Sequence, residues 1–199
     1  MPYTSEHKSR TRSKIVDSAR KLFNRHGFEQ VSIDRIMSEA GLTRGGFYNH
    51  FGSKDELYAA AVTSFTECNP FRPRASHTDS PQQLARMLIN LYLSDEVLAD
   101  VESHCPLYAL PGDVARAGLS PQKAYTQLIR NLTRVYAMAL SAEPDGGERA
   151  QVIVSLCVGG MVLARTTDDA ALSASLRESA RRQALALLAG GADVRGQTT

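Results

Sequence analysis

Residues 32–57, SIDRIMSEAGLTRGGFYNHFGSKDEL, constrain the fold of this chain more than any other segment, because they join two short helical patterns through a tight turn. In the first pattern, apolar side chains recur on one helical face, at Ile33, Ile36, Met37 and Ala40. Ser32 is a suitable N-cap, and Gly41 can adopt the left-handed backbone that ends a helix and redirects the chain. The spacing predicts a helix-turn-helix within residues 32–51.

The second helix of this motif is expected to begin after Thr43 and to separate apolar from polar residues. Phe47 and Phe51 are four positions apart and face the core. The outward positions are Thr43, Arg44, Gly45, Gly46, Tyr48, Asn49 and His50. In such motifs the start of this helix reaches base edges in the major groove, where Arg44 can bind guanine O6 and N7 together. Each glycine costs a helix about 1 kcal/mol relative to Ala, which fits a backbone that must closely approach another surface.

A third helix is predicted to start directly after the motif, because Ser53 and Glu56 have the spacing of a capping box. Its N-terminal amides and Lys54 suit a phosphate group. Leu57, Ala61 and Phe65 continue an apolar face along this helix.

The first 65 or so residues resemble the DNA-binding domain of the TetR/AcrR family of bacterial transcriptional regulators. The similarity rests on a lead helix, TRSKIVDSARKLFNRHGFEQVSID, followed by AGLTRGGFYNHFGSKDEL. The second stretch matches the family pattern of Gly, apolar, Ser/Thr, three variable residues, Tyr, any residue, His-Phe and then Lys-Asp/Glu-x-Leu. Gly46 departs from this pattern, since a larger residue is commoner there.

This resemblance implies roles for individual residues. Those matching Tyr48, His50 and Lys54 contact backbone phosphates in the family, and those matching Thr43, Arg44 and Asn49 lie at or near the bases. The complete set of predicted DNA-binding residues is Ser32, Thr43, Arg44, Gly45, Gly46, Tyr48, Asn49, His50 and Lys54.

The charge distribution agrees with a nucleic-acid-binding head. The whole chain of 199 residues carries a net charge of +2. Through residue 54 there are ten basic and five acidic side chains, a net charge of +5, so the remaining residues carry −3. Neutralisation of phosphates supplies most of the non-specific affinity for DNA, and a positive head provides it. The alternative interpretation of the same charges is an ordinary solvated helix surface.

The rest of the chain predicts an all-α protein of about nine helices in two parts. Residues 8–66 form the DNA-binding domain, 67–190 a ligand-binding and dimerisation domain, and 191–199 a flexible tail. A helix starts at Ser80-Pro81, an irregular stretch covers 94–104, and Pro111-Gly112 divides the next helix. A long helix follows Ser120 and ends near Ser141. The last two helices cover roughly 148–165 and 169–188.

The middle of the chain resembles the TetR subgroup with a Cys-Pro-Leu motif at the start of the sixth helix, a family whose members bind small inducers. The resemblance implies a cavity lined by Tyr92, Cys105, Leu107, Tyr108, Tyr125, Leu128, Leu132 and Tyr136. Tyrosines are the better candidates because a buried hydroxyl needs a partner. Ordinary core packing is the alternative for each of these residues.

The final two helices have small and leucine side chains that permit close packing: Val152, Leu156, Gly159, Gly160, Leu163, Leu172, Leu176, Ala180, Ala184 and Leu188. In the family these helices form a four-helix dimer interface, and an intramolecular core is the alternative. A dimer would read a palindrome with half-sites about 34 Å apart.

Several classes of protein are not expected. Cys68, Cys105 and Cys157 are too few and too widely spaced for a disulfide framework or a zinc site. No catalytic residues, metal ligands or cofactor site are predicted, and the chain is not expected to be an enzyme. No apolar run approaches the roughly 18–20 residues that span a membrane, and no signal peptide is evident, so we expect a cytoplasmic protein.

The function predicted from the sequence is therefore a homodimeric repressor that binds a palindromic DNA operator and is released by a small-molecule inducer. Two alternatives remain open. The first is a redox- or electrophile-sensing regulator, because Cys105 follows His104 at a predicted helix start, where a thiol pKa is lowered. The second is a helical small-molecule-binding protein without DNA function.

Overall fold

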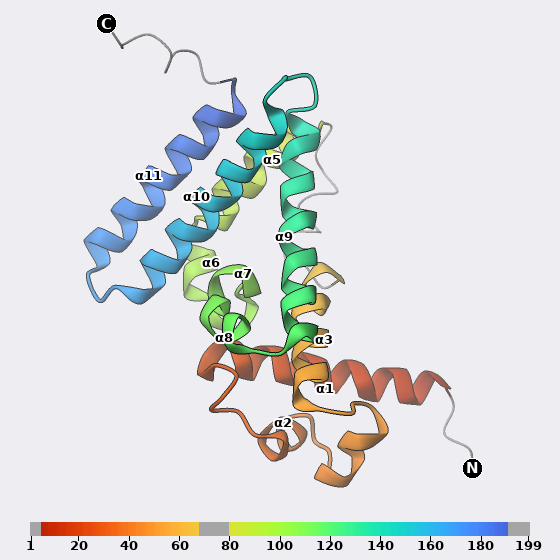
Figure 1. The fold of residues 1–199 in the computed structure, drawn as a ribbon. Helices are drawn as coiled ribbons and strands as arrows, with labels where there is room; N and C mark the ends of the chain where they lie inside the picture. Colours follow the sequence, from red (N-terminus) through yellow and green to blue (C-terminus); the bar gives the residue numbers. More distant parts are fainter. Residues whose placement is uncertain (1–4, 68–79, 191–199) are drawn as a thin grey trace, which may run out of the picture. The chain divides into compact units, whose positions relative to one another are not determined.

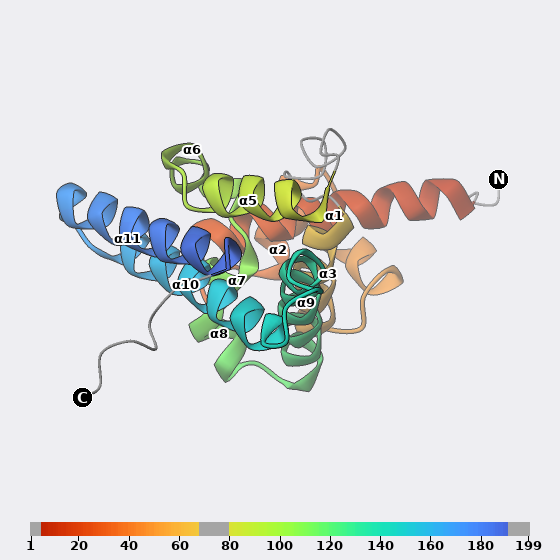
Figure 2. The ribbon, with the colours of Figure 1, turned by 90° about the horizontal axis from the view of Figure 1, so that it is seen from above.

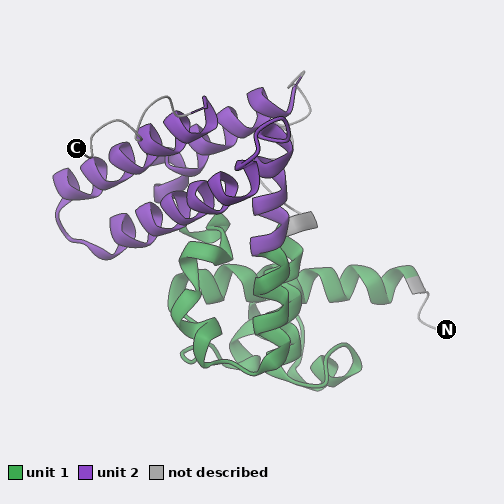
Figure 3. Cartoon of the chain, turned by 45° about the horizontal axis from the view of Figure 1, so that its top comes forward, with its two compact units in different colours: residues 1–69, 100–128 green, residues 70–99, 129–199 purple. Residues whose placement is uncertain are grey.

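A computed structural model of the chain describes residues 5–67 and 80–190, and within these ranges every regular element is helical. The described residues form ten α-helices and two short 3-10 segments (Figure 1). The predicted all-α fold class is confirmed. The chain divides into two compact units (Figure 3): residues 1–69 with 100–128, and residues 70–99 with 129–199. We call them unit 1 and unit 2.

Unit 1 contains the predicted head. It consists of α1 (Ser5–His26), α2 (Ile33–Glu39), the 3-10 segment η1 (Arg44–Asn49) and α3 (Lys54–Glu67), with α1 packed against both α2 and α3. The ring of Tyr58 stacks on Phe28 at 4.6 Å and meets Phe23 edge-on at 5.1 Å, measured between ring centroids. This aromatic cluster joins α1 and α3, so the head has a core of its own.

Unit 1 also includes residues from the middle of the chain. They form η2 (Val101–Ser103), α7 (Pro106–Ala109), α8 (Pro111–Arg116) and the start of α9 (Leu119–Ala139). Asn24 Nδ2 on α1 donates to the carbonyl oxygens of Glu102 at 3.1 Å and His104 at 3.0 Å. Asp113 accepts the backbone N–H of Phe28 at 3.0 Å. These bonds satisfy backbone groups that would otherwise be unpaired at the end of α1 and in the 101–104 segment.

Two details of this region differ from the sequence-based expectation. Residues 94–104 were expected to be irregular, yet they contain α6 (Asp95–Ala99) and η2, each started by a polar side chain: Ser94 accepts from the N–H of Val97, and Asp100 from that of Ser103. In addition, residues 100–128 pack in unit 1, whereas the predicted division placed residues 67–190 in a second domain. The bonds from Asn24 and Asp113 that hold this segment are long-range and have no sequence pattern.

Unit 2 contains α5 (Pro81–Tyr92), α6, residues 129–139 of α9, α10 (Gly146–Thr166) and α11 (Ala170–Leu188). The predicted start of α5 is confirmed, since Ser80 Oγ accepts the N–H of Gln83 at 3.2 Å. α10 and α11 run side by side in both views (Figures 1 and 2) and form the most extensive helix pair of the chain. Arg177 on α11 is buried and donates to the carbonyl of Leu93 at 3.0 Å, which ties α11 to the end of α5.

Within the described residues, α10 is the one helix that is long and apolar enough to cross a membrane, judged by length and composition only. Polar and small residues such as Ser155 and Gly159 interrupt its apolar sequence, so α10 does not contradict the expectation that no uninterrupted apolar run approaches 18–20 residues. Ile153, Cys157 and Met161 of α10 are fully buried within the protein, as in the core helix of a packed domain.

Candidate nucleic-acid interface

The turn between α2 and η1 has the predicted geometry. Ser32 Oγ accepts the backbone N–H of Arg35 at 3.1 Å and caps α2. Gly41 follows the helix with a φ of 68°, in the left-handed region where glycine is favoured over residues with a Cβ. The N–H of Leu42 then bonds to the carbonyl of Met37 at 2.8 Å. A Cβ at position 41 would meet no atom within 4 Å, so the backbone angle is the reason for glycine there.

The recognition segment, residues 44–49, is a 3-10 helix and not the α-helix expected from the sequence. The physical reason lies in its length and composition. Gly45 and Gly46 each cost an α-helix about 1 kcal/mol, and a segment of one to two turns has too few hydrogen bonds to offset this. Thr43 precedes the segment as its N-cap residue but makes no side-chain cap bond. The predicted orientation is nevertheless confirmed, because Phe47 and Phe51 are 0% and 2% exposed.

The opposite side of the recognition segment is polar and open to solvent. Thr43, Arg44, Gly45 and Asn49 are exposed, and Tyr48 is 61% exposed although it is a large aromatic residue. Arg44 Nη1 forms an ion pair with Asp34 of α2 at 2.6 Å, with both side chains more than half exposed. These outward groups therefore contribute little to the core of the head.

The two remaining predicted phosphate ligands are less open. His50 is half-buried, and burial followed by the nearby charges of Lys8, Arg12 and His7 lowers its pKa. Lys54 Nζ donates to the carbonyl of Phe28 at 2.5 Å and lies 4.1 Å from the centroid of its ring. Burial is also the main cause that lowers the pKa of Lys54. Lys54 therefore fixes the loop after α1, and its phosphate role remains a prediction.

The start of α3 has the predicted capping box. The N–H of Glu56 bonds to Ser53 Oγ at 3.1 Å, and Glu56 Oε2 accepts the N–H of Gly52 at 2.7 Å. The bond from the Glu56 side chain thus goes to Gly52, one residue before the N-cap residue Ser53. The result fixes the direction of α3 directly after the recognition segment.

A pocket of about 460 Å³ lies between the first turns of α1 and the recognition segment. We call it the α1–η1 pocket. It is lined by His7, Lys8, Thr11, Met37, Leu42, Thr43, Gly46, Asn49 and His50. His7, Lys8 and Thr11 were not among the predicted site residues. No local sequence pattern places the beginning of α1 beside residues 43–50, so only the excess of basic residues at the start of the chain could have pointed to them.

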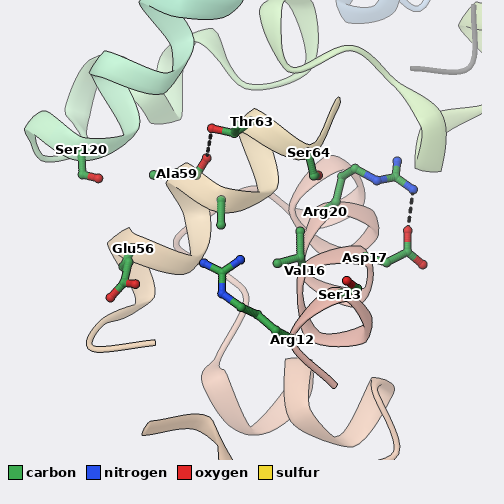
Figure 4. Close-up of a pocket in the computed structure, with 11 residues that line it drawn as sticks. Arg12, Ser13, Val16, Asp17, Arg20, Glu56, Ala59, Thr63, Ser64 and Ser120 are labelled. Atoms are coloured by element: carbon green, nitrogen blue, oxygen red, sulfur yellow. Dashed lines mark hydrogen bonds and ion pairs between the residues drawn. The ribbon is translucent and has the colours of Figure 1, made fainter. Parts of the chain in front are cut away.

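A second pocket of about 380 Å³ lies between α1 and α3 in unit 1 (Figure 4), and we call it the α1–α3 groove. Its walls carry charges of both signs. Asp17 accepts from Arg20 at 2.9 Å, and Glu56 lies on the opposite wall. Arg12 extends between the two helices, and its guanidinium lies 4.5 Å from the centroid of the Phe51 ring.

The predicted ligand-binding residues are divided between the units. Unit 1 contains Cys105, Leu107, Tyr108, Tyr125 and Leu128, and unit 2 contains Tyr92, Leu132 and Tyr136. The hydroxyl of Tyr125 donates to the carbonyl of Leu107 at 2.6 Å. Burial, with a smaller effect from Cys105, raises the pKa of Tyr125 to about 12. None of the eight residues lines either pocket described above. Their ligand-binding role therefore remains a prediction.

Cys105 is in the predicted place, directly before α7, but its thiol is shielded. The residue is 2% exposed, and α7 has only four residues. The neighbouring His104 ring packs against Tyr108 at 5.0 Å between centroids. A reagent would need a local opening of the chain to reach this sulfur. Cys157 is buried in unit 2, and burial raises its pKa to about 12. Cys68 lies outside the described residues.

The predicted dimer residues fall into three groups. Val152, Leu163 and Leu172 are between 42% and 53% exposed, as an intersubunit surface requires. Leu156, Gly159, Gly160 and Leu176 are half-buried. Ala180, Ala184 and Leu188 are at most 8% exposed, so their assignment to a dimer surface is wrong. They are covered within unit 2; a Cβ built at Gly160 would lie only 2.8 Å from that of Ala180.

Comparison with known proteins agrees with this geometry. The sequence profile described as "Bacterial regulatory proteins, tetR family" matches residues 15–61. The HTH-type transcriptional regulator TtgR of Pseudomonas putida is 31% identical over 103 residues, which are 50% of this chain and 49% of TtgR. The uncharacterized HTH-type transcriptional regulator YfiR of Bacillus subtilis is 36% identical over 59 residues, 30% of this chain and 29% of YfiR. The chain thus spans half or less of the length of these curated relatives.

Solved structures extend the similarity of fold over most of the chain. A TetR-family transcriptional regulator from Agrobacterium tumefaciens has a TM-score of 0.72 at 17% identity, covering 88% of this chain and 98% of its own. A TetR transcriptional regulator from Chloroflexus aurantiacus has a TM-score of 0.70 at 20% identity, covering 93% and 97%.

The head, its turn and the polar side of residues 44–49 identify residues 15–61 as a helix-turn-helix domain similar to those of tetR-family bacterial regulatory proteins. Over most of the chain, the likeness to TetR-family regulators of known structure is one of fold.

Proposed function

We propose that this protein binds duplex DNA through the outward side of residues 43–50 and thereby regulates transcription. The observation that carries the proposal is the division of the recognition segment into a buried and an exposed side. Phe47 and Phe51 hold it in the core, while Arg44, Tyr48 and Asn49 are solvent-exposed. Arginine and asparagine are the side chains that recognise guanine and adenine in the major groove. Tyrosine contributes a hydroxyl for a backbone phosphate.

The charge of the head supports the same proposal. The excess of five positive charges through residue 54 provides the sequence-independent part of DNA affinity. Arg44 is held by Asp34 at 2.6 Å on the surface, and an exposed pair of this kind is weak enough to be exchanged for a base. The residue roles proposed for Ser32, Thr43, Gly45, Gly46, His50 and Lys54 follow the family resemblance given above.

The active form is proposed to be a homodimer on a palindromic operator. One recognition segment of six residues contacts few bases, and two related by a twofold axis double the number. Val152 and Leu163 on α10 and Leu172 on α11 are exposed apolar side chains that a partner subunit would cover. Gly159 adds an open position, since a Cβ there would meet nothing within 4 Å.

Regulation is proposed to be repression in the cytoplasm, relieved by a small-molecule inducer. A coupling of roughly 1–3 kcal/mol between inducer and DNA is sufficient for such control. A mass spectrum of the purified protein under native conditions would reveal a retained small molecule.

The test of DNA binding starts from duplexes enriched by the wild-type protein from a random-sequence pool. Arg44→Ala should weaken binding to the enriched duplex by roughly 1–3 kcal/mol, the value of one bidentate base contact, and should reduce its preference over random DNA. Arg116→Ala is the matched control, because Arg116 is also exposed and paired with an acid, Asp113, at 3.0 Å within unit 1.

A hydroxyl-radical footprint on the enriched duplex should show two related half-sites about one helical turn apart. If no sequence is enriched, or if R44A and R116A bind equally well, the proposed function is wrong. A footprint with a single half-site would contradict the homodimer alone.

A further inference from the structure

We propose that the α1–η1 pocket holds one phosphate of the DNA backbone, with Lys8 as its charged ligand, so that the start of α1 clamps the strand beside the bases that Arg44 reads. The proposal rests on the proposed function and adds binding residues to it. The family resemblance assigned a phosphate contact to His50 of this pocket, but no sequence motif and no part of the resemblance assigned a role to His7, Lys8 or Thr11.

The position of the α1–η1 pocket favours a phosphate of the DNA backbone as its ligand. The pocket lies entirely within unit 1, and its walls are shared between α1 and the recognition segment. Thr43, Asn49 and His50 line it from one side, and Lys8 and Thr11 from the other. The major groove is about 12 Å wide and bordered by phosphates on both sides. A duplex whose base edges meet residues 43–49 therefore brings backbone phosphates to the same surface.

The charges of the side chains around the pocket also favour an anion. His7, Lys8 and His50 line the pocket, and the charge of Arg12 also acts on His50. Among the described residues that line the pocket there is no Asp or Glu. The first carboxylate of α1, Glu6, pairs with Arg10 at 2.6 Å. Burial is the main cause that lowers the pKa of His50, and the like charges of Lys8, Arg12 and His7 lower it further; a bound anion would offset these like charges.

The α1–α3 groove provides the contrast that makes this assignment specific. It is of similar size and shares α1 with the first pocket, yet Asp17 and Glu56 line it together with Arg12 and Arg20 (Figure 4). Its arginine at position 20 is already bonded to Asp17 at 2.9 Å and to the carbonyl of Glu102 at 2.5 Å. A phosphate in that groove would meet two carboxylates, whereas in the α1–η1 pocket it would meet none from the lining.

The uncharged side chains that line the pocket include donors suited to phosphate oxygens. Phosphate ligands in protein–DNA complexes combine cations with hydroxyl, amide and backbone N–H donors. The lining includes the hydroxyls of Thr11 and Thr43 and the amide of Asn49. Gly46 leaves its wall open, because the nearest atom to a Cβ there would be the flexible end of Met37 at 3.7 Å. The pocket thus offers both kinds of donor to one phosphodiester group.

The test compares two exposed lysines of α1, of which Lys8 lines the pocket and Lys14 lines neither pocket. Lys8→Gln and Lys14→Gln each remove one positive charge from the same helix. On the enriched duplex, K8Q should lower the slope of log Kobs against log[salt] by about one unit and weaken binding roughly 3- to 10-fold. K14Q should leave the slope unchanged. Circular dichroism should show both variants fully helical.

A second measurement identifies the phosphate. Neutral methylphosphonate linkages are placed one at a time along each strand of the enriched duplex. Several positions should weaken wild-type binding, and one of them per half-site should have no effect on K8Q, because the phosphate at that position and Lys8 form one contact.

The outcomes separate this proposal from the proposed function. If the wild type shows no Arg44-dependent binding, the proposed function itself fails. If Arg44 matters but K8Q behaves like K14Q, or if no methylphosphonate effect depends on Lys8, the phosphate clamp is wrong. If calorimetry finds that inorganic phosphate binds the wild type but not K8Q, while DNA binding is the same in both, the pocket serves a free anion and the proposal is overturned.

Discussion

The recognition segment of unit 1 and helix α10 of unit 2 contain two and four glycines, and the two helices differ in why glycine is there. At two of the glycines of α10, packing leaves no room for a side chain. A Cβ at Gly146 would overlap the carbonyl oxygen of Leu140, and one at Gly160 would lie 2.8 Å from the Cβ of Ala180. In the recognition segment, a Cβ at Gly45 would meet nothing within 4 Å. Unit 2 therefore uses glycine to close its own interior, whereas the recognition segment keeps a bare backbone toward the outside.

The largest effect that this comparison predicts is the destabilisation of unit 2 by Gly146→Ala. The added methyl group would overlap backbone atoms that cannot move aside as a flexible side chain can. We expect a loss of about 3 kcal/mol in the free energy of unfolding, at the upper end of the usual cost of overpacking. Urea unfolding followed by circular dichroism measures it.

Gly147→Ala is the matched control for that experiment, since a Cβ at the next residue of the same helix would meet nothing within 4 Å. Replacing an unhindered helical glycine should leave the protein as stable or more stable by up to about 1 kcal/mol. Equal unfolding midpoints for G146A and G147A would show that the glycine at 146 is not required by packing.

The next effect concerns Gly45→Ala and should appear in DNA binding instead of stability. The position is exposed and open, so the free energy of unfolding should stay the same or rise by roughly 0.5–1 kcal/mol. If the backbone approaches DNA closely here, a methyl group should weaken binding to the enriched duplex about tenfold, or about 1.4 kcal/mol. Fluorescence anisotropy measures this, with G147A as control. Unchanged affinity would mean that the bare backbone has no role at the DNA surface.

The sequence was informative where the determinants are local. The caps at Ser32, Ser53 and Ser80 and the turn at Gly41 were predicted correctly, because each depends on residues within four positions of one another. The burial of Phe47 followed from helical periodicity alone. These features define the helix-turn-helix and hence the candidate site.

What could not be predicted depends on contacts between distant residues. The bonds from Asn24 to the carbonyls of Glu102 and His104 span about 80 positions and bring the middle of the chain into unit 1. Likewise, nothing in the sequence shows that Lys54 is held by the carbonyl of Phe28 or that Lys8 lies beside residues 43–50. The burial of Ala184 within unit 2 could not be predicted either, because a row of small residues on a helix fits an internal contact and a dimer surface equally well.

The smallest predicted effect tests whether the exposed face of the recognition segment is restrained before it meets DNA. The ion pair between Arg44 and Asp34, at 2.6 Å, must separate for Arg44 to reach a base, and an exposed pair of this kind is worth about 0–1 kcal/mol. Asp34→Asn removes the competing carboxylate, so affinity for the enriched duplex should rise roughly 2- to 5-fold.

A control variant and a double mutant separate this cause from a general change in charge. Glu39→Gln removes another exposed acid from α2 and should raise affinity less than D34N does. In an Arg44→Ala background the benefit of D34N should disappear, because the two residues act through one contact. If D34N strengthens binding equally with and without Arg44, Asp34 acts only as a negative charge near DNA, and the ion pair does not restrain Arg44 in the free protein.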